Sequence, residues 1–252
     1  MTARGSTDRR QPRGSAARRL AARIRRRRLV AVRPLLLAAA GCAVAGLAAW
    51  ALLGSSLLGV HRVTAAGTRR LAPATVLGAA RVPGHHPLAT LDTAAIARRV
   101  AALPAVATVH VVRDWPRTVR VVVTERVAVA VVAHGDGYRL VDAGGVPFWP
   151  VASRPPRLPL LQVRAAASGD PATRAALAVL AALPQQVRRQ VSTIEAPTPA
   201  KVELLLRRGR AVKTVVWGTP GDGIRKAAVL AALLRRPGHV YDVSTPSIAT
   251  IR

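Results

Sequence analysis

The chain has 252 residues, with 39 Lys and Arg against 11 Asp and Glu, and its formal net charge is +28. Half of its residues are hydrophobic, although only 3% are aromatic. So much apolar side chain must be buried in protein or in lipid, which excludes a wholly disordered chain. The single cysteine, Cys42, excludes an internal disulfide and a metal site built from several thiolates.

Residues 1–33 contain twelve arginines, one acidic residue and no aromatic residue. Such a segment cannot bury a core, so we expect a disordered basic arm. An arm that binds nucleic acid has a similar composition, because Arg binds phosphate well. The apolar stretch that follows favours contact with the anionic lipid of a membrane surface, and we expect no specific nucleic acid as a partner.

Residues 34–60 contain no ionisable group other than the Cys42 thiol. A helix of this length covers roughly 40 Å, whereas the hydrocarbon layer of a bilayer is about 30 Å thick. We therefore predict a transmembrane helix over residues 34–59. Because the basic residues precede it, the positive-inside rule places residues 1–33 in the cytoplasm and the rest of the chain across the plasma membrane.

Two other interpretations of the apolar stretch are open. A cleaved signal peptide has an apolar region of about 7–15 residues, which is shorter than this one. The series Ala39-Ala40-Gly41-Cys42 resembles a lipidation signal, but the expected Leu three residues before the cysteine is missing. Apolar sequence also continues after Cys42, which favours an ordinary membrane span.

The residues after the span predict strand, helix, helix, strand and strand, in that order. Pro73 is typical of a first helical turn, Asp92 of a helix N-cap and Pro104 of a helix end. Valines alternate along the last strand, as expected where one face is buried. The predicted elements are a strand over Val60–Val63, helices from Pro73 and after Asp92, strands over Val106–Arg113 and Thr118–Glu125, and a hairpin loop over Arg113–Arg117.

Three spaced stretches in this region together make up one pattern: Leu103–Val109, Val112-Arg113-Asp114-Trp115-Pro116-Arg117-Thr118-Val119, and Val123-Thr124-Glu125-Arg126. The pattern resembles the FtsQ/DivIB family of bacterial cell-division proteins, although Thr108 and Ala128 depart from it. The resemblance implies a POTRA domain over residues 60–126. It also implies that Arg113, Trp115, Pro116, Glu125 and Arg126 hold motif positions. The residues themselves predict that Glu125 pairs with a neighbouring arginine.

From Val127 onward the sequence predicts a β-rich domain with two helices. Short apolar runs separated by Gly-rich or Pro-rich turns are typical of strands. The predicted strands are Val127–Ala133, Tyr138–Val141, Val146–Trp149, Val191–Ala196, Lys201–Leu206, Ala211–Trp217, Val240–Ser244 and Ile248–Ile251. The predicted helices are one from Asp170 to Pro184, with Leu177, Leu180 and Leu183 inward, and one over Gly223–Arg236, with Ile224, Ala228 and Ala231 inward.

This half also resembles the FtsQ/DivIB family, in Tyr138-x-Leu140-Val141-Asp142 with Gly145, in Trp217-Gly218 with Lys226, and in Tyr241-Asp242-Val243. The resemblance implies an α+β ectodomain whose residues 127–252 form an FtsQ-type domain with a mixed sheet. Asp142, Gly145 and Lys226 are its motif positions. In the family the last strands bind FtsB and FtsL by strand addition, a mode that uses free edge hydrogen bonds. By resemblance the partner-binding residues are Thr245, Ser247, Ile248, Ala249, Thr250 and Ile251.

No motif for a reaction is present in the sequence. Gly218–Lys226 resembles a phosphate loop but lacks the Gly-Lys-Ser/Thr series, so we expect a turn at the start of a helix. His85-His86 has no third ligand nearby in sequence, which favours exposed loop histidines. We expect no catalytic, cofactor-binding or metal-binding residue and no small-molecule substrate.

The sequence therefore predicts a single-pass scaffold that recruits division proteins at the septum and is not an enzyme. Two alternatives belong to other classes. A POTRA-bearing transport factor predicts repeated POTRA units, but one unit of strand, helix, helix, strand and strand is present. A membrane-anchored hydrolase of the cell wall needs a reactive set of residues, and the scattered acidic residues provide no such pair.

Overall fold

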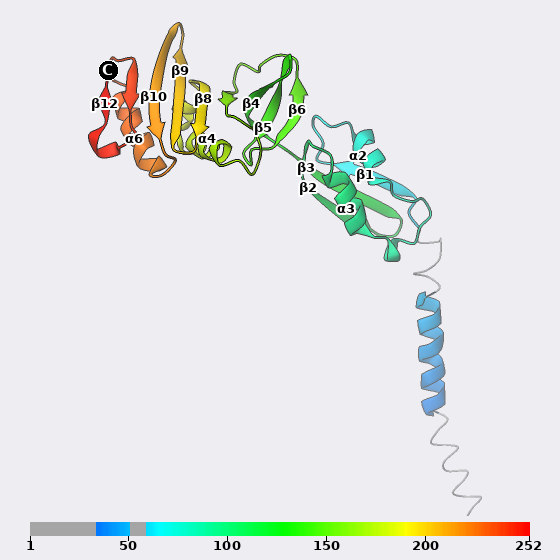
Figure 1. Ribbon diagram of the computed structural model, residues 1–252. Helices are drawn as coiled ribbons and strands as arrows, with labels where there is room; N and C mark the ends of the chain where they lie inside the picture. Colours follow the sequence, from blue (N-terminus) through cyan, green and yellow to red (C-terminus); the bar gives the residue numbers. More distant parts are fainter. Residues whose placement is uncertain (1–33, 51–58) are drawn as a thin grey trace, which may run out of the picture. The chain divides into compact units, whose positions relative to one another are not determined.

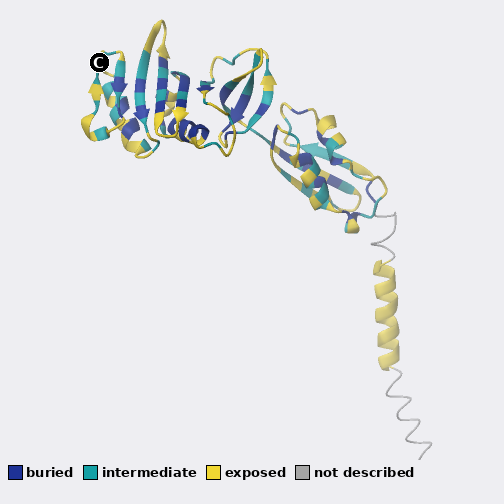
Figure 2. Cartoon of the chain, in the orientation of Figure 1, coloured by how far each residue is buried: buried dark blue, intermediate teal, exposed yellow. Residues whose placement is uncertain are grey.

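The structure is a computed structural model that describes residues 34–50 and 59–252. The predicted basic arm and residues 51–58 of the predicted span lie outside these ranges. Residues 34–50 form a helix whose residues are all exposed (Figures 1 and 2). Within the described ranges, no helix is both long enough and apolar enough to cross a membrane.

The described residues divide into two compact units. Of the described residues, the first unit contains 34–50, 59–61, 83–91 and 115–118. Here Gly59 and Pro87 form an isolated antiparallel bridge, and the His61 N–H donates to the Arg117 carbonyl at 2.9 Å. A short 3-10 helix, η2, covers Leu88–Thr90. The second unit contains the rest of the chain from Arg62 onward.

The N-terminal part of the second unit has a three-stranded sheet in the order β1-β3-β2 and two helices (Figure 1). The elements are β1 (Arg62–Ala66), α2 (Pro73–Ala80), α3 (Thr93–Ala101), β2 (Val106–Asp114) and β3 (Thr118–Glu125). The predicted series of strand, helix, helix, strand and strand is confirmed. The first strand begins two residues later than the sequence indicated.

Local signals account for these elements. Pro73 occupies the first turn of α2, where its missing N–H costs nothing, and α2 ends at Arg81 in the left-handed conformation. The Asp92 side chain caps α3 by accepting from the Ala95 N–H at 2.9 Å. The buried residues of α3 are Ile96 and Val100, four residues apart on one face.

The C-terminal part of the second unit contains a nine-stranded sheet in the order β12-β11-β10-β9-β8-β7-β4-β5-β6. Its strands are β4 (Ala128–His134), β5 (Gly137–Asp142), β6 (Pro147–Val151), β7 (Leu160–Gln162), β8 (Val191–Thr198), β9 (Lys201–Arg208), β10 (Ala211–Gly218), β11 (Val240–Asp242) and β12 (Thr250–Ile251). The pairs β4–β7, β7–β8 and β10–β11 are parallel and the others are antiparallel. The predicted mixed sheet is therefore confirmed.

Three helices belong to this sheet: α4 (Pro171–Ala182), α5 (Gln185–Arg188) and α6 (Gly223–Leu233). Helix α4 packs on β8 and β9 and contacts α6 (Figure 1). The core between them is mostly aliphatic, with Trp217 and Tyr241 as its largest buried side chains. The sequence predicted neither α5 nor β7, because each is at most four residues long and has no periodicity of its own.

The predicted inward face of α6 is wrong. Ile224 is 86% exposed and Ala228 is also exposed, whereas Lys226, Ala227 and Leu230 are buried. The helix is rich in Ala, so its sequence marks no face strongly. Its rotation is set instead by tertiary contacts, among them the buried Lys226 side chain.

Candidate partner-binding edge

The nine-stranded sheet has two edges of different chemistry. Strand β6 carries Pro147 and Pro150, which have no N–H to donate to an added strand. Strand β12 has no proline, and in the part of the chain that the structure describes no strand pairs with its outer side. β12 is therefore the edge that can accept a further strand.

The backbone geometry shows which groups of the β12 edge face outward. Val240 and Arg252 exchange two backbone hydrogen bonds, at 2.8 and 2.9 Å, and Tyr241 lies opposite Ile251. In an antiparallel pair, bonded and non-bonded positions alternate. The N–H and C=O of Ile251 therefore point away from β11. The same alternation gives Ala249, which has extended dihedral angles, an outward-facing backbone.

The six residues assigned to partner binding lie together but are not all strand. Thr245 precedes a 3-10 helix, η3 (Pro246–Ile248), that contains Ser247 and Ile248, and Ala249 follows it. Only Thr250 and Ile251 belong to β12, so the predicted strand over Ile248–Ile251 is wrong in its first half. Pro246 begins the 3-10 turn, which presents Ile248 to solvent with 75% of its surface exposed.

Buried Tyr241 supports this edge from β11. Its hydroxyl donates toward the carbonyls of Arg236 (2.8 Å) and Gly238 (3.2 Å) and accepts from the Lys213 ammonium at 2.9 Å. The loop between α6 and β11 is thereby fixed beside β12. A fixed edge loses less conformational entropy when a partner strand binds.

Lys226, in α6, is a buried cation that binds backbone carbonyls. Its ammonium donates to the carbonyls of Trp217 (3.1 Å) and Thr219 (2.9 Å), which fastens α6 to the end of β10. Burial lowers the pKa of Lys226, and the charge of Asp222 offsets part of that effect. The Gly-rich segment before Lys226 is a turn that leads into α6 from Asp222, as the sequence predicted.

Glu125 is the last residue of β3, and it binds the loop between β1 and α2. Its carboxylate accepts from the backbone N–H groups of Arg69, Arg70 and Leu71 at 2.6–3.0 Å. The sequence predicted a pair with a neighbouring arginine. Arg69 and Arg70 do bind Glu125, but through their main-chain N–H groups. Arg70 contributes its charge as well.

Arg126 contacts residues on both sides of the junction between the two predicted domains. Its Nε donates to the Pro104 carbonyl at 2.9 Å, and its Nη1 lies 2.5 Å from Asp142 Oδ2. The other oxygen of Asp142 accepts from the N–H groups of Gly144 and Val146. Through these contacts Arg126 joins the backbone at Pro104 to the Asp142 carboxylate, with which it forms an ion pair.

Three further motif residues, Arg113, Trp115 and Pro116, lie at one hairpin. Arg113 is in β2, and Trp115 and Pro116 form the turn to β3, joined by a cis peptide bond. Trp115 is 50% exposed. Asp114, next to them, pairs with Arg120 across the hairpin.

Two of the histidines contact one another. His85 stacks edge-on against His61, with ring centroids 5.2 Å apart, and His86 Nδ1 lies 3.1 Å from the Pro87 carbonyl. In the described ranges no group of three or more His, Cys, Asp or Glu side chains could hold a metal ion. The His61–His85 contact could not be predicted from the sequence, because the two residues lie 24 positions apart.

Two known protein families match the chain. Residues 58–126 match the family described as POTRA domain, FtsQ-type, and residues 130–243 match Cell division protein FtsQ/DivIB, C-terminal. The class of this protein is therefore one in which a POTRA domain is followed by a mixed sheet that has one open edge. Cell division protein FtsQ of Streptomyces bingchenggensis is 40% identical over 246 residues, which cover 94% of this chain and 89% of that protein.

Mycobacterial relatives are longer. Cell division protein FtsQ of Mycobacteroides abscessus is 42% identical over 196 residues, which cover 78% of this chain and 62% of that protein. Cell division protein FtsQ of Mycolicibacterium smegmatis is 42% identical over 196 residues, which cover 78% of this chain and 58% of that protein. The chain thus spans about three fifths of the length of these relatives. With these similarities, the chain belongs to the FtsQ/DivIB family of cell division proteins.

Proposed function

We propose that this protein is a non-enzymatic, single-pass membrane scaffold that recruits and links other division proteins at the septum. The observation that carries the proposal is the open β12 edge, with outward-facing backbone groups at Ala249 and Ile251. Membership of the FtsQ/DivIB family favours this role over that of a POTRA-bearing transport factor.

The proposed membrane arrangement rests on the sequence. Residues 1–33 form the cytoplasmic arm beside anionic lipid, residues 34–59 cross the plasma membrane, and residues 60–126 and 127–252 form two domains outside the cytoplasm. The charge-free stretch 34–60 directly after twelve arginines supports this order. Each arginine near an anionic leaflet adds about 1 kcal/mol of attraction.

The proposed partners are single-pass division proteins that resemble FtsB and FtsL. A partner strand placed beside β12 would bond to the backbone of Ala249 and Ile251. Exposed Ile248, on the adjoining η3, gives such a strand an apolar contact. Helix α6 contacts η3 and carries a second exposed apolar side chain, Ile224.

Recovery of partners with the full-length chain tests the proposal. The Ile251→Pro variant removes the outward N–H and leaves the Thr250 and Arg252 pairing groups in place. We expect this variant to recover FtsB-like and FtsL-like partners at least about tenfold less well, because an edge hydrogen bond and its geometry are lost. Truncation after Ser244 should abolish recovery.

Ile251→Val is the matched control, because it keeps the N–H and a β-branched side chain. It should recover the partners as the unmodified chain does. Thermal unfolding of all variants checks that the sheet remains folded. Equal recovery by Ile251→Pro and Ile251→Val would show that β12 is not the binding edge.

A further inference from the structure

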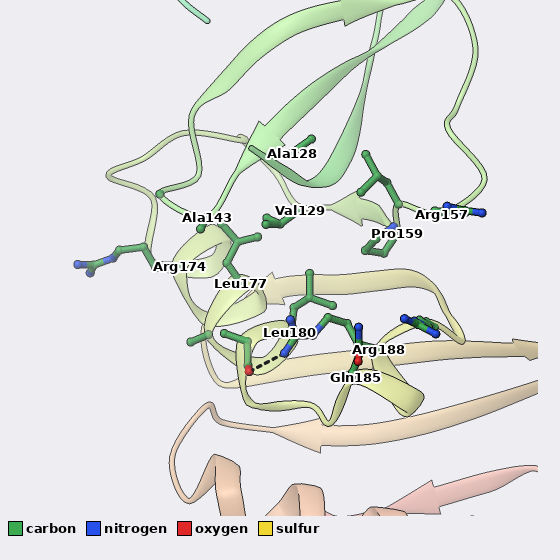
Figure 3. A pocket seen from close by; sticks show the side chains of 15 residues that line it. Ala128, Val129, Ala143, Arg157, Pro159, Arg174, Leu177, Leu180, Gln185 and Arg188 are labelled. Atoms are coloured by element: carbon green, nitrogen blue, oxygen red, sulfur yellow. Dashed lines mark hydrogen bonds between the residues drawn. The ribbon is translucent and has the colours of Figure 1, made fainter. Parts of the chain in front are cut away.

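A second surface, remote from β12, has the features of a binding groove. It has a volume of about 670 Å³ and lies between the start of β4, the turn after β5, the segment 157–159 and helices α4 and α5 (Figure 3). Its floor is apolar, formed by Val129, Pro159, Leu177 and Leu180. Five strands separate β4 from β12 in the sheet, so the groove is distinct from the proposed edge site.

Four arginines surround this apolar floor: Arg157, Arg174, Arg188 and Arg189. All four are exposed, and no Asp or Glu lines the groove. None of them takes part in a salt bridge with another residue that the structure describes. The groove thus combines apolar surface with four positive charges, of which that of Arg174 also acts on Asp170 at the start of α4.

Hydrogen bonds within the protein hold the segments that line the groove. Arg188 Nη2 donates to the carbonyls of Ala181 (3.0 Å) and Leu183 (2.9 Å), the first of which is drawn in Figure 3. The Pro159 carbonyl accepts from the Val131 N–H at 2.9 Å, and Arg154 donates to the carbonyls of Leu158 and Ser192. A preformed groove loses little conformational entropy on binding.

One wall of the groove is a single helix face. Arg174, Leu177, Ala178 and Ala181 lie at helical spacings of three, four and seven residues along α4. Ala178 and Ala181 are exposed and small, so they leave room for the side chains of an incoming segment. This pattern suits an amphipathic segment that lies along α4.

We propose that this groove binds an acidic amphipathic segment of a partner polypeptide. Its apolar side chains cover the floor, and at least two Asp or Glu side chains reach the arginines. Guanidinium groups match carboxylates in planar, two-point geometry. A polymer of sugar and phosphate supplies the charge but has little apolar surface for the Leu, Val and Pro floor. The proposal goes beyond the scaffold role and does not depend on binding at β12.

Selection from a phage library of random 12-residue peptides tests the proposal. The full-length chain in detergent micelles is the bait, and empty micelles remove peptides that bind detergent. We expect the enriched peptides to combine two or more acidic residues with two or more large apolar residues. Fluorescence anisotropy then measures the affinity of the most enriched peptide for the chain and its variants.

Two variants should each lower the affinity for that peptide at least about tenfold. Ala178→Trp fills the groove with an indole ring, and Arg174→Glu with Arg189→Glu reverses two charges at its rim. The matched control is Arg225→Glu with Arg235→Glu, which reverses one exposed charge in α6 and one just after it. This control should change the affinity less than about twofold. Ile251→Pro should also leave the affinity unchanged, which separates this site from the β12 edge.

Several outcomes would overturn the proposal. They include enrichment of neutral or basic peptides, no binding up to about 1 mM peptide, and no effect of Ala178→Trp. An equal loss with the α6 control would show that net charge alone attracts the peptide. Displacement of the peptide by phosphatidylglycerol vesicles, but not by further acidic peptide, would assign the groove to lipid instead. Thermal unfolding of each variant confirms that α4 remains folded.

Discussion

At the scale of single residues, charged side chains form hydrogen bonds with backbone N–H and C=O groups in loops and at strand ends. Glu125 receives three successive backbone N–H groups, and Lys226 donates to two carbonyls at the end of β10. A carboxylate and an ammonium group are the charge types that these backbone groups bind most strongly. At these two motif positions, one in each half of the chain, the side chain therefore holds backbone segments together.

The pH dependence of Glu125 gives a first prediction. Burial raises the pKa of Glu125, but the N–H groups of Arg69, Leu71 and Arg70 outweigh it, so the pKa lies below its ordinary value of 4.5. Because the folded state favours the charged form, this stabilisation is complete above pH 4.5 and is lost as the pH falls through the lowered pKa.

Urea unfolding of residues 59–252 checks this prediction. At pH 7 we expect Glu125→Gln to lower the free energy of unfolding by about 1 kcal/mol or less, since solvent screens part of the interaction. The difference from the unmodified chain should shrink between pH 4.5 and pH 3. A difference that stays constant over this range would contradict the role of the charge.

At the scale of elements, the turn between β5 and β6 lies close against the start of α4. Asp142 accepts from Gly144 and Val146, and Gly145 has a φ of +82°. A Cβ atom at position 145 would lie 2.9 Å from Thr173 Cγ2 on α4 and 3.3 Å from the Ala167 carbonyl oxygen. Glycine is needed here both for the dihedral angle and for the close approach.

Gly145→Ala should therefore destabilise the protein by about 1–3 kcal/mol, because it combines a left-handed dihedral angle with a steric clash. Gly144→Ala is the matched control, since the atoms nearest to its Cβ would be those of the Asp142 side chain, at 3.4 Å or more. We expect this control to change the free energy of unfolding much less. Thermal or urea unfolding measures both. Equal losses would show that the turn adapts to a side chain.

At the scale of the whole molecule, the distribution of charge predicts the membrane orientation. Twelve arginines precede the apolar stretch, and 27 Lys and Arg against ten acidic residues follow from position 34 onward. The positive-inside rule depends on the basic residues close to the span, so the first group should stay in the cytoplasm.

Protease protection in spheroplasts tests this orientation. An epitope fused before Met1 should survive protease added outside, and an epitope fused after Arg252 should be lost. Permeabilised cells serve as the control and should lose both epitopes. Survival of the second epitope in intact spheroplasts would show that the domains lie in the cytoplasm.

Much of the fold was predictable because its signals are local. Pro73, Asp92 and Asp170 mark helix starts, and the alternating Val119, Val121 and Val123 mark the buried face of a strand. These signals act through backbone groups and side chains a few residues apart. The spaced motifs around Trp115 and Asp142 then indicated the family, which the similarity to known proteins confirmed.

By itself, then, the sequence determined the order of the elements, the two family domains and the position of the charge-free stretch. Only the tertiary structure decided the pairing of β7 with β4, the buried face of α6, the short β12 edge and the groove surrounded by arginines. The physical reason is that these features depend on residues far apart in sequence. Their positions are fixed by packing and by non-local backbone hydrogen bonds rather than by local propensity.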